Sequence, residues 1–205
     1  MEMKSHWETV YNTKAADAVS WYAPHLNASL SYIQRTELPH SASVIDVGGG
    51  EATLVDDLLN AGYENVSVFD ISGKALQVAQ ERLAHRASKV DWVVGDVLTH
   101  AFTMQSVDIW HDRAVFHFLT EESQRRAYVA QVLHALRPGG FAIVGTFGPE
   151  GPLQCSGLQV SRYAPDELHG KFGGRFQLVA SSFDQHTTPW GSKQQFVYCF
   201  CRLEH

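Results

Sequence analysis

The residues best suited to chemistry in this chain stand at the ends of short apolar runs. Residues 44–47 lead into a turn with three consecutive glycines, Gly48, Gly49 and Gly50. Glycines at the end of a strand let the backbone reverse into a helix and let a ligand approach bare main chain. A dinucleotide fingerprint would need a further glycine at position 53, where the chain has Thr53. The turn therefore predicts a ligand site, but the sequence does not match the fingerprint of a dinucleotide-binding site.

Two carboxylates follow the next two apolar runs. Asp70 ends residues 66–70, and Asp96 follows Gly95 after residues 90–94. A carboxylate accepts hydrogen bonds from two hydroxyl donors. Either aspartate taken alone is also an ordinary capping or loop residue, because Asp commonly follows strands. Only their joint placement beside the glycine turn points to a site.

The run Asp46-x-Gly48-x-Gly50-x-Ala52 resembles the signature of class I S-adenosylmethionine-dependent methyltransferases. The resemblance extends over residues 43–146, where Leu136-Arg137-Pro138-Gly139-Gly140 is similar to the family's turn before its fifth strand. It implies S-adenosylmethionine as cofactor, with Asp70 on the ribose hydroxyls and Asp96 at the adenine amino group. The residues expected to hold the cofactor are Asp46, Gly48, Gly49, Gly50, Asp70, Ile71, Gly95, Asp96, Val97, Asp112, Trp7 and Tyr11.

An unusual polar cluster follows the fourth apolar run, residues 107–112, and holds the expected catalytic residues His111, Asp112 and His117. The resemblance places this segment against the methionine end of the cofactor, with Asp112 receiving its ammonium. His117 is expected to act as a base or to orient the substrate, because imidazole titrates near neutral pH. A structural histidine at 117 and an Asp112–Arg113 ion pair stay open as alternatives. The family's Asn/Asp-Pro-Pro-Tyr motif is absent, which argues against adenine or glutamine as acceptor.

Two further segments are expected to enclose the substrate. Residues 1–40 are rich in aromatic side chains and predict a helical lid, whose aromatic faces would favour a cationic methylsulfonium. Residues 148–163 are rich in Gly and Pro and predict a loop at the same sheet edge. Arg162 and Tyr163 are candidates for a substrate carboxylate, and Cys155 with the two histidines for a thiol or metalloid. The expected substrate-binding residues are Trp21, Tyr22, Arg113, His117, Cys155, Arg162 and Tyr163.

The elements that position these residues alternate between strand and helix patterns, which predicts an α/β fold with a Rossmann-like doubly wound sheet. Five parallel strands are expected, followed by an antiparallel pair, because no helix separates the last two. The predicted strands are residues 44–47, 66–70, 90–94, 107–112, 141–146, 176–183 and 195–202, and the predicted helices are 52–61, 72–83, 120–136 and 165–171.

One domain is predicted over residues 1–202, with the lid at 1–40, the cofactor core at 43–146 and the substrate loop with the last strands at 147–202. A chain of 205 residues is too short for two ordinary domains. Residues 203–205 resemble the start of a cloning tag and are left out of the predicted fold.

Charge and composition restrict the classes of binding partner that the sequence predicts. With 16 basic and 22 acidic residues the chain lacks a broad surface for phosphates, so no nucleic acid is expected. No run approaches the roughly 20 apolar residues that span a bilayer, so no membrane is expected and a cytoplasmic location is predicted. The three cysteines have no metal-ligand spacing, so no metal is expected. The oligomeric state is not predicted.

The leading functional hypothesis is methyl transfer to a small molecule, with a thiol or other soft nucleophile among the acceptors considered. The alternatives are a protein acceptor, a catalytically silent cofactor-binding subunit and a nicotinamide-dependent oxidoreductase. A small-molecule enzyme should enclose its substrate, whereas a protein methyltransferase should present an open groove. The shape of the site therefore separates the first two hypotheses.

Overall fold

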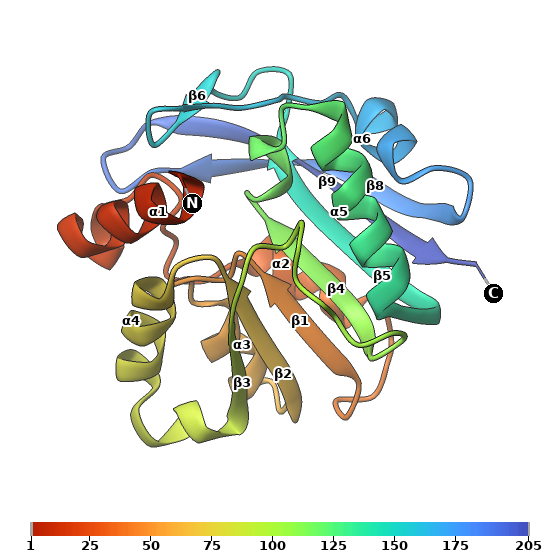
Figure 1. Cartoon of the computed structure of the whole chain (residues 1–205), viewed down its shortest axis with the longest axis horizontal. Coiled ribbons are helices and arrows are strands. Elements are labelled where there is room, and N and C mark those ends of the chain that lie inside the picture. The colour runs from red at the N-terminus through yellow and green to blue at the C-terminus, as the bar shows by residue number, and fades with distance from the viewer. Residues whose placement is uncertain (1, 205) are drawn as a thin grey trace.

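A computed structural model describes residues 2–204, which form one seven-stranded sheet with helices on both faces (Figure 1). The strands are β1 (Ser43–Val47), β2 (Asn65–Asp70), β3 (Val90–Val94), β4 (Val107–Arg113), β5 (Leu136–Phe147), β8 (Phe176–Thr187) and β9 (Lys193–Leu203). Their order in the sheet is β3-β2-β1-β4-β5-β9-β8. The first five are parallel, and β9 runs antiparallel to both β5 and β8. The predicted fold class is confirmed.

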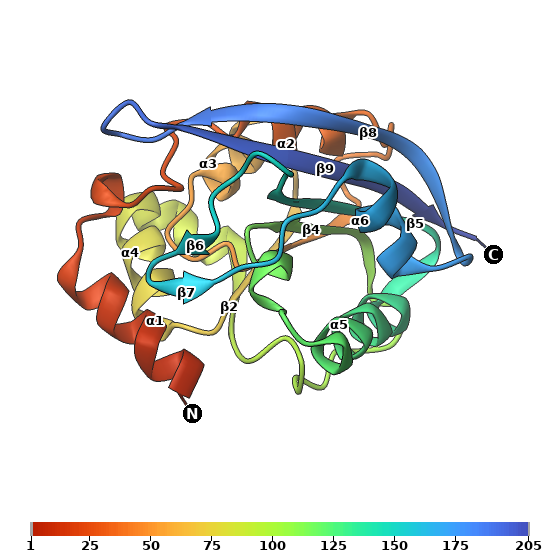
Figure 2. The same cartoon turned by 90° about the horizontal axis from the view of Figure 1, so that it is seen from above.

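The helices divide between the two faces of the sheet (Figure 2). They are α1 (Glu2–Thr13), α2 (Asn27–Gln34), α3 (Leu54–Asn60), α4 (Gly73–Leu83), α5 (Glu122–Ala135) and α6 (Pro165–Phe172). Side chains of α2, α3 and α4 pack on one face, and those of α5 and α6 pack on the other. Successive strand residues point to opposite faces, so Val44 enters the first core and Ile45 the second. Because both faces are covered at the centre of the sheet, β1 and β5 are buried along most of their length.

The N-terminal helix lies at the carboxyl edge of the sheet, beside α4 (Figure 1). Its buried aromatic residues Trp7 and Tyr11 pack against Trp21 and Phe118. A short hairpin, β6 (Gln154–Cys155) with β7 (Leu158–Gln159), faces the same edge and was not predicted. Within residues 2–204, no helix is long and apolar enough to cross a bilayer.

Several predicted boundaries differ from the structure, most clearly at the start of β5 and at the end of β9. The Pro138-Gly139-Gly140 turn was expected between helix and strand, but α5 ends at Ala135 and β5 already includes the turn. Gly139 has a positive φ of 81° and its carbonyl accepts a hydrogen bond from Arg202 Nε, so the turn becomes an irregular start of the strand. Leu203, left out of the predicted fold, pairs with Phe176 in the sheet and is 2% exposed.

Candidate functional site

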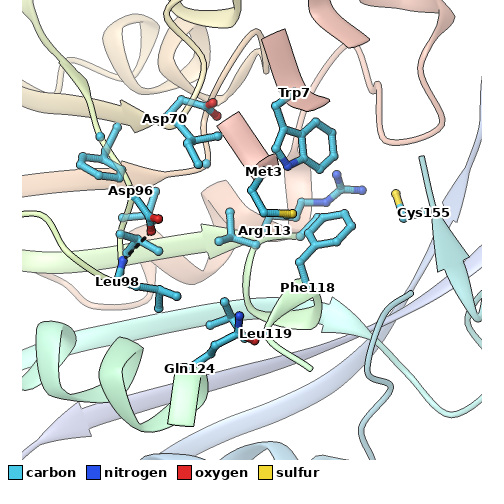
Figure 3. Close-up of a pocket in the computed structure, with 18 of the residues that line it drawn as sticks. Met3, Trp7, Asp70, Asp96, Leu98, Arg113, Phe118, Leu119, Gln124 and Cys155 are labelled. Atoms are coloured by element: carbon cyan, nitrogen blue, oxygen red, sulfur yellow. Dashed lines mark hydrogen bonds between the residues drawn. The ribbon is translucent and has the colours of Figure 1, made fainter. Parts of the chain in front are cut away.

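A cavity of about 220 Å³ lies at the carboxyl ends of β1, β2, β3 and β4, beneath α1 (Figure 3). Loops and strand ends that are far apart in the chain meet there, because parallel strands bring their carboxyl ends to one edge. The sequence-predicted residues that line it are Trp7, Tyr11, Trp21, Gly48, Asp70, Ile71, Gly95, Asp96, Val97, Arg113 and Cys155.

The glycine turn forms one wall of the cavity. Gly48 has a φ of +70°, and a Cβ there would come within 2.0 Å of Val115 Cγ2, so only glycine fits. Gly50 also has positive φ, and a Cβ there would lie 3.1 Å from Asp70 Oδ2 and 3.2 Å from the Tyr11 hydroxyl. The turn therefore presents bare backbone beside the tip of β2 and the lid helix, as a close ligand contact requires.

Asp70 is a buried carboxylate in the wall of the cavity. Its Oδ1 accepts a hydrogen bond from the backbone N–H of Ser72 at 2.8 Å. Loss of solvent raises the pKa of Asp70 to about 7, and the nearby carboxylates of Asp46, Glu8 and Glu51 add to the rise. A buried carboxylate forms few hydrogen bonds with water. Hydrogen-bond donors of a ligand, such as hydroxyl groups, would therefore stabilise the Asp70 carboxylate.

Asp96 lies on the same side of the cavity as Asp70, at the tip of the neighbouring strand (Figure 3). The backbone N–H of Gly95 donates to the Asp70 carbonyl at 2.9 Å, which joins the two strand ends. Asp96 is exposed, and its Oδ1 accepts a hydrogen bond from Leu98 N at 2.9 Å. Phe69 and Val97 supply apolar walls around these two carboxylates. We call this region, with Ile71, Gly95 and Leu98, the carboxylate half of the cavity.

The other side of the cavity is aromatic and carries one positive charge (Figure 3). Ring centroids of Trp7 lie 5.1 Å from Phe118 and 5.8 Å from Trp21, in edge-on contacts. Burial raises the pKa of the Tyr11 hydroxyl well above its usual range and also raises that of the Cys155 thiol, so both keep their protons. We call this region the aromatic half; it consists of Trp7, Tyr11, Trp21, Arg113, Phe118 and Cys155.

Asp46 and His111 form a buried pair beneath the glycine turn and do not line the cavity. His111 Nδ1 lies 2.7 Å from Asp46 Oδ1, and the side chains are 1% and 4% exposed. A Cβ on Gly49 would approach Asp46 Oδ2 to 2.6 Å, so the carboxylate supports the turn from below. The structure therefore places His111, Asp46 and Gly49 behind the cavity wall, and their expected catalytic and cofactor contacts stay predictions.

Asp112 also lies behind the cavity wall. It accepts hydrogen bonds from the backbone N–H groups of Val115 and Phe116 and from the Tyr128 hydroxyl, at 2.8, 3.1 and 2.6 Å. Burial raises its pKa to about 6, although these donors oppose the rise. Its oxygens bind the turn after β4, and the expected contact with the cofactor's ammonium stays a prediction.

His117 is fully buried and is not part of the cavity wall. Its ring stacks on Phe147 with centroids 4.4 Å apart, and neither ring nitrogen has a partner within residues 2–204. Burial, with a smaller contribution from Arg113, lowers its pKa to about 3. The structure therefore places His117 outside the cavity wall, and its expected catalytic and substrate-binding roles stay predictions.

Three predicted substrate residues lie elsewhere. Arg162 donates to the carbonyls of Pro149 and Gly151 at 2.7 and 3.2 Å and so fixes its own loop. Tyr163 is 5% exposed and packs in the core, and Tyr22 does not line the cavity either. The Arg162 and Tyr163 carboxylate site is therefore not supported.

Sequence reasoning missed the other lining residues, which are Met3, Val47, Phe69, Leu98, Ala114, Val115, Phe118, Leu119 and Gln124. Phe118 follows His117 in a 3₁₀ turn at Phe116–Phe118, where successive side chains point in different directions. The apolar residues next to the polar cluster indicated that one of them could line the site. The sequence does not show which of the neighbours His117 and Phe118 faces the cavity.

The carboxylate half has the chemistry that an adenosine requires. Asp70 offers a buried acceptor, Gly48 offers bare backbone, and Phe69 and Val97 offer apolar walls for a flat ring. Among residues 2–204, no three His, Cys, Asp or Glu side chains gather in a way that could hold a metal ion.

Comparisons with known proteins agree with this geometry. A methyltransferase domain model matches residues 44–140. The human EEF1A lysine methyltransferase 2 is 22% identical over 190 residues, covering 86% of this chain and 75% of that protein. The same enzyme of Mus musculus is 21% identical over 155 residues, covering 69% and 64%.

Solved structures show the same fold. The structure titled "Conversion of a Disulfide Bond into a Thioacetal Group during Echinomycin Biosynthesis" superposes with a TM-score of 0.78 at 17% identity, covering 98% of this chain and 92% of that one. A methyltransferase from Anabaena variabilis, described as dependent on S-adenosylmethionine, gives 0.75 at 15% identity, covering 100% and 96%. Residues 44–140 therefore form a methyltransferase domain, and the chain is a methyltransferase that uses S-adenosylmethionine as its cofactor.

Proposed function

We propose that this enzyme methylates a small molecule bound in the aromatic half of the cavity. The observation that carries the proposal is how that half is enclosed. The lid helix supplies Trp7 and Tyr11, each 9% exposed, and the β6 hairpin supplies Cys155, 7% exposed. Walls drawn from separate segments suit a ligand that enters whole, because they exclude water from a direct displacement. A protein acceptor would need a groove for its backbone.

The proposed division of labour follows the two halves. Asp70 receives the ribose hydroxyls, Asp96 meets the adenine amino group, and the backbone of Gly48 and Gly50 approaches the ligand closely. S-adenosylmethionine supplies a methyl group already activated on a sulfonium. The chain's own task is then to orient the acceptor and exclude water, which contributes several kcal/mol through effective molarity. Tyr11, the residue of the aromatic half that lies beside Gly50, closes the boundary between cofactor and acceptor.

A protein acceptor is the second candidate, and the relatives' printed names favour it. Human and mouse proteins that match this chain are called EEF1A lysine methyltransferases. At 22% identity the printed name describes the human protein and not this chain. The enclosed aromatic half favours a small-molecule acceptor instead. A silent subunit is disfavoured because the cavity continues beyond the carboxylate half instead of being filled by side chains. The predictions of a cytoplasmic location and of no nucleic-acid partner remain untested.

Methyl transfer to a size-fractionated extract tests the proposal. The protein is incubated with methyl-labelled S-adenosylmethionine and with a cell extract separated by ultrafiltration into small molecules and macromolecules. Label is expected in the small-molecule fraction, and the Asp70→Asn variant, which loses a ribose acceptor, serves as the control without transfer. Label confined to macromolecules would establish the second candidate instead. Tight cofactor binding without transfer to either fraction would establish a silent subunit.

A further inference from the structure

We propose that the methyl acceptor is an anionic oxygen or sulfur of a small, largely apolar acid, and that Arg113 receives its negative charge. The inference rests on the proposed function and names the substrate class of the same site. It moves anion recognition from Arg162, where the sequence suggested it, to the end of β4.

Arg113 is a cation in the cavity wall without an acidic partner. Its guanidinium carbon lies 4.3 Å above the Phe196 ring, and its Nη1 donates to the Trp21 carbonyl at 3.1 Å. That bond uses one of five N–H donors. No aspartate or glutamate of residues 2–204 forms an ion pair with it. A half-buried guanidinium that is fixed in place and lacks a carboxylate is suited to an anionic ligand.

The charges of the cavity are separated. Asp70 and Asp96 lie on one side, and Arg113 lies on the other, between Trp7 and Phe118 (Figure 3). Arg113 is therefore the charged side chain of the aromatic half. Around it, Trp7, Trp21 and Phe118 offer apolar surface, so a ligand with an apolar body and one negative group matches the wall. An ammonium acceptor such as lysine would instead meet a like charge, which costs binding energy.

The aromatic half also holds no group able to remove a proton. Tyr11 and Cys155 line it, but burial raises both pKa values and each group keeps its own proton. His117 lies behind the wall with a lowered pKa, and the Asp112 carboxylate is held by Val115, Phe116 and Tyr128. An acceptor must therefore arrive already ionised. Arg113 favours that form, because an opposite charge lowers the pKa of an acid beside it.

Such a transfer balances without a base. A lone pair of the anionic atom forms the new bond to the methyl carbon, and the sulfur keeps the electron pair of the broken carbon–sulfur bond. The negative acceptor and the positive sulfonium both become neutral, and no proton leaves. A carboxylate would give a methyl ester and a thiolate would give a thioether.

The test begins with the small-molecule extract, separated in mildly alkaline buffer into fractions retained by an anion exchanger, retained by a cation exchanger, or retained by neither. Label from the cofactor is expected in molecules of the anion-retained fraction. Acceptor activity in the cation-retained or unretained fraction would overturn the inference while leaving the proposed function intact. Label found only on macromolecules would remove the proposed function and the inference with it. Release of the label by mild alkali identifies an ester, and resistance identifies a thioether or an ether.

Arg113→Met then tests the residue itself, because it removes the charge but keeps a long side chain on Phe196. The expected result is a rise of about tenfold or more in KM for the anion-retained acceptor, with cofactor affinity in calorimetry changed less than about twofold. Arg113→Lys should recover part of the loss. Arg175→Met, which removes an exposed guanidinium outside the cavity, is the matched control and should leave KM unchanged. Weakened cofactor binding with an unchanged KM would assign Arg113 to the carboxylate of the cofactor and overturn the inference.

A binding measurement without turnover completes the test. Trp7 and Trp21 line the cavity, so their fluorescence reports a ligand in the complex with S-adenosylhomocysteine. The probes are benzoate, thiophenol and benzylamine, which share a ring and differ in charge. Benzoate and thiophenol should change the fluorescence of the wild type more than that of Arg113→Met. A preference for benzylamine in the wild type would contradict the inference.

Discussion

Glu8 of the lid helix accepts a hydrogen bond from the backbone N–H of Gly73, with an Oε1–N distance of 2.8 Å. Gly73 begins α4, the helix that follows Asp70, and the N–H groups of a first helical turn have no partner within their own helix. A carboxylate there also interacts favourably with the helix dipole. The contact therefore joins the lid to the strand tip that carries the ribose acceptor.

Glu8→Ala should loosen the lid and weaken cofactor binding by about three- to tenfold. The substitution removes a charge-assisted cap worth about 1 kcal/mol. Calorimetric titration with S-adenosylhomocysteine measures the change. Thr9→Ala, on the exposed side of the same helix, is the control and should bind like the wild type. Equal affinity in the Glu8 variant would show that the lid docks by its aromatic contacts alone.

Asp70→Asn should raise stability in alkaline buffer while weakening cofactor binding at least tenfold. The pKa of Asp70 in the folded protein is about 7, above its ordinary value of 3.8, so between these pH values the folded state binds more protons than the unfolded state. The free energy of unfolding therefore falls as pH rises through this window, and the loss is complete above it. Asparagine does not ionise, so the variant should keep the free energy of unfolding that the wild type loses, which should amount to about 1–3 kcal/mol.

Urea unfolding of both proteins across this pH range measures the effect. Glu51 and Asp112 also have raised pKa values, about 7 and about 6, and titrate in the same window. The informative quantity is therefore the difference between the two proteins at each pH. A variant that is less stable than the wild type above neutral pH would contradict the account of Asp70.

His111→Leu should lower the free energy of unfolding by about 2–4 kcal/mol, because it leaves the buried Asp46 carboxylate without its partner. The bond between them is 2.7 Å long and both side chains are almost fully buried. Chemical unfolding at neutral pH measures the loss. His85→Leu is the matched control on an exposed position and should change stability by less than about 0.5 kcal/mol. Similar losses in the two variants would argue against a structural Asp46–His111 pair.

His117→Phe should keep turnover within about twofold of the wild type, because the ring stacks on Phe147 and makes no side-chain hydrogen bond within the described chain. The lowered pKa of His117, about 3, means that the unfolded state takes up a proton below 6.5 while the folded state does not. The wild type therefore loses stability as pH falls from 6.5 toward 3, and the variant should not. Turnover assays and acid unfolding check both statements. A large fall in turnover would show that His117 takes part in the reaction.

Much of the fold and of the carboxylate half was predictable from local sequence. Apolar runs separated by helical spacing predict parallel strands, and parallel strands bring Asp70, Asp96 and the Gly48 turn to one edge. The structure places all three in the wall of one cavity. The reason is that these residues follow their strands directly, so the position of the strand determines the position of the side chain.

The aromatic half was less predictable because it depends on turns and on distant packing. Ala114 adopts a φ of +78°, and Asp112 binds the next two backbone N–H groups, which together turn His117 inward and Phe118 toward the cavity. Arg113 is held over Phe196, a residue of β9 that is far away in the sequence. Neither arrangement has a signature in spacing or composition.

The most direct test of the site is a crystal structure of the complex with S-adenosylhomocysteine. We expect both ribose hydroxyls within hydrogen-bond distance of Asp70, the adenine beside Asp96, and the sulfur facing the aromatic half with Arg113 free to receive an acid. An adenosine bound elsewhere, or one that makes no contact with Asp70, would contradict the account.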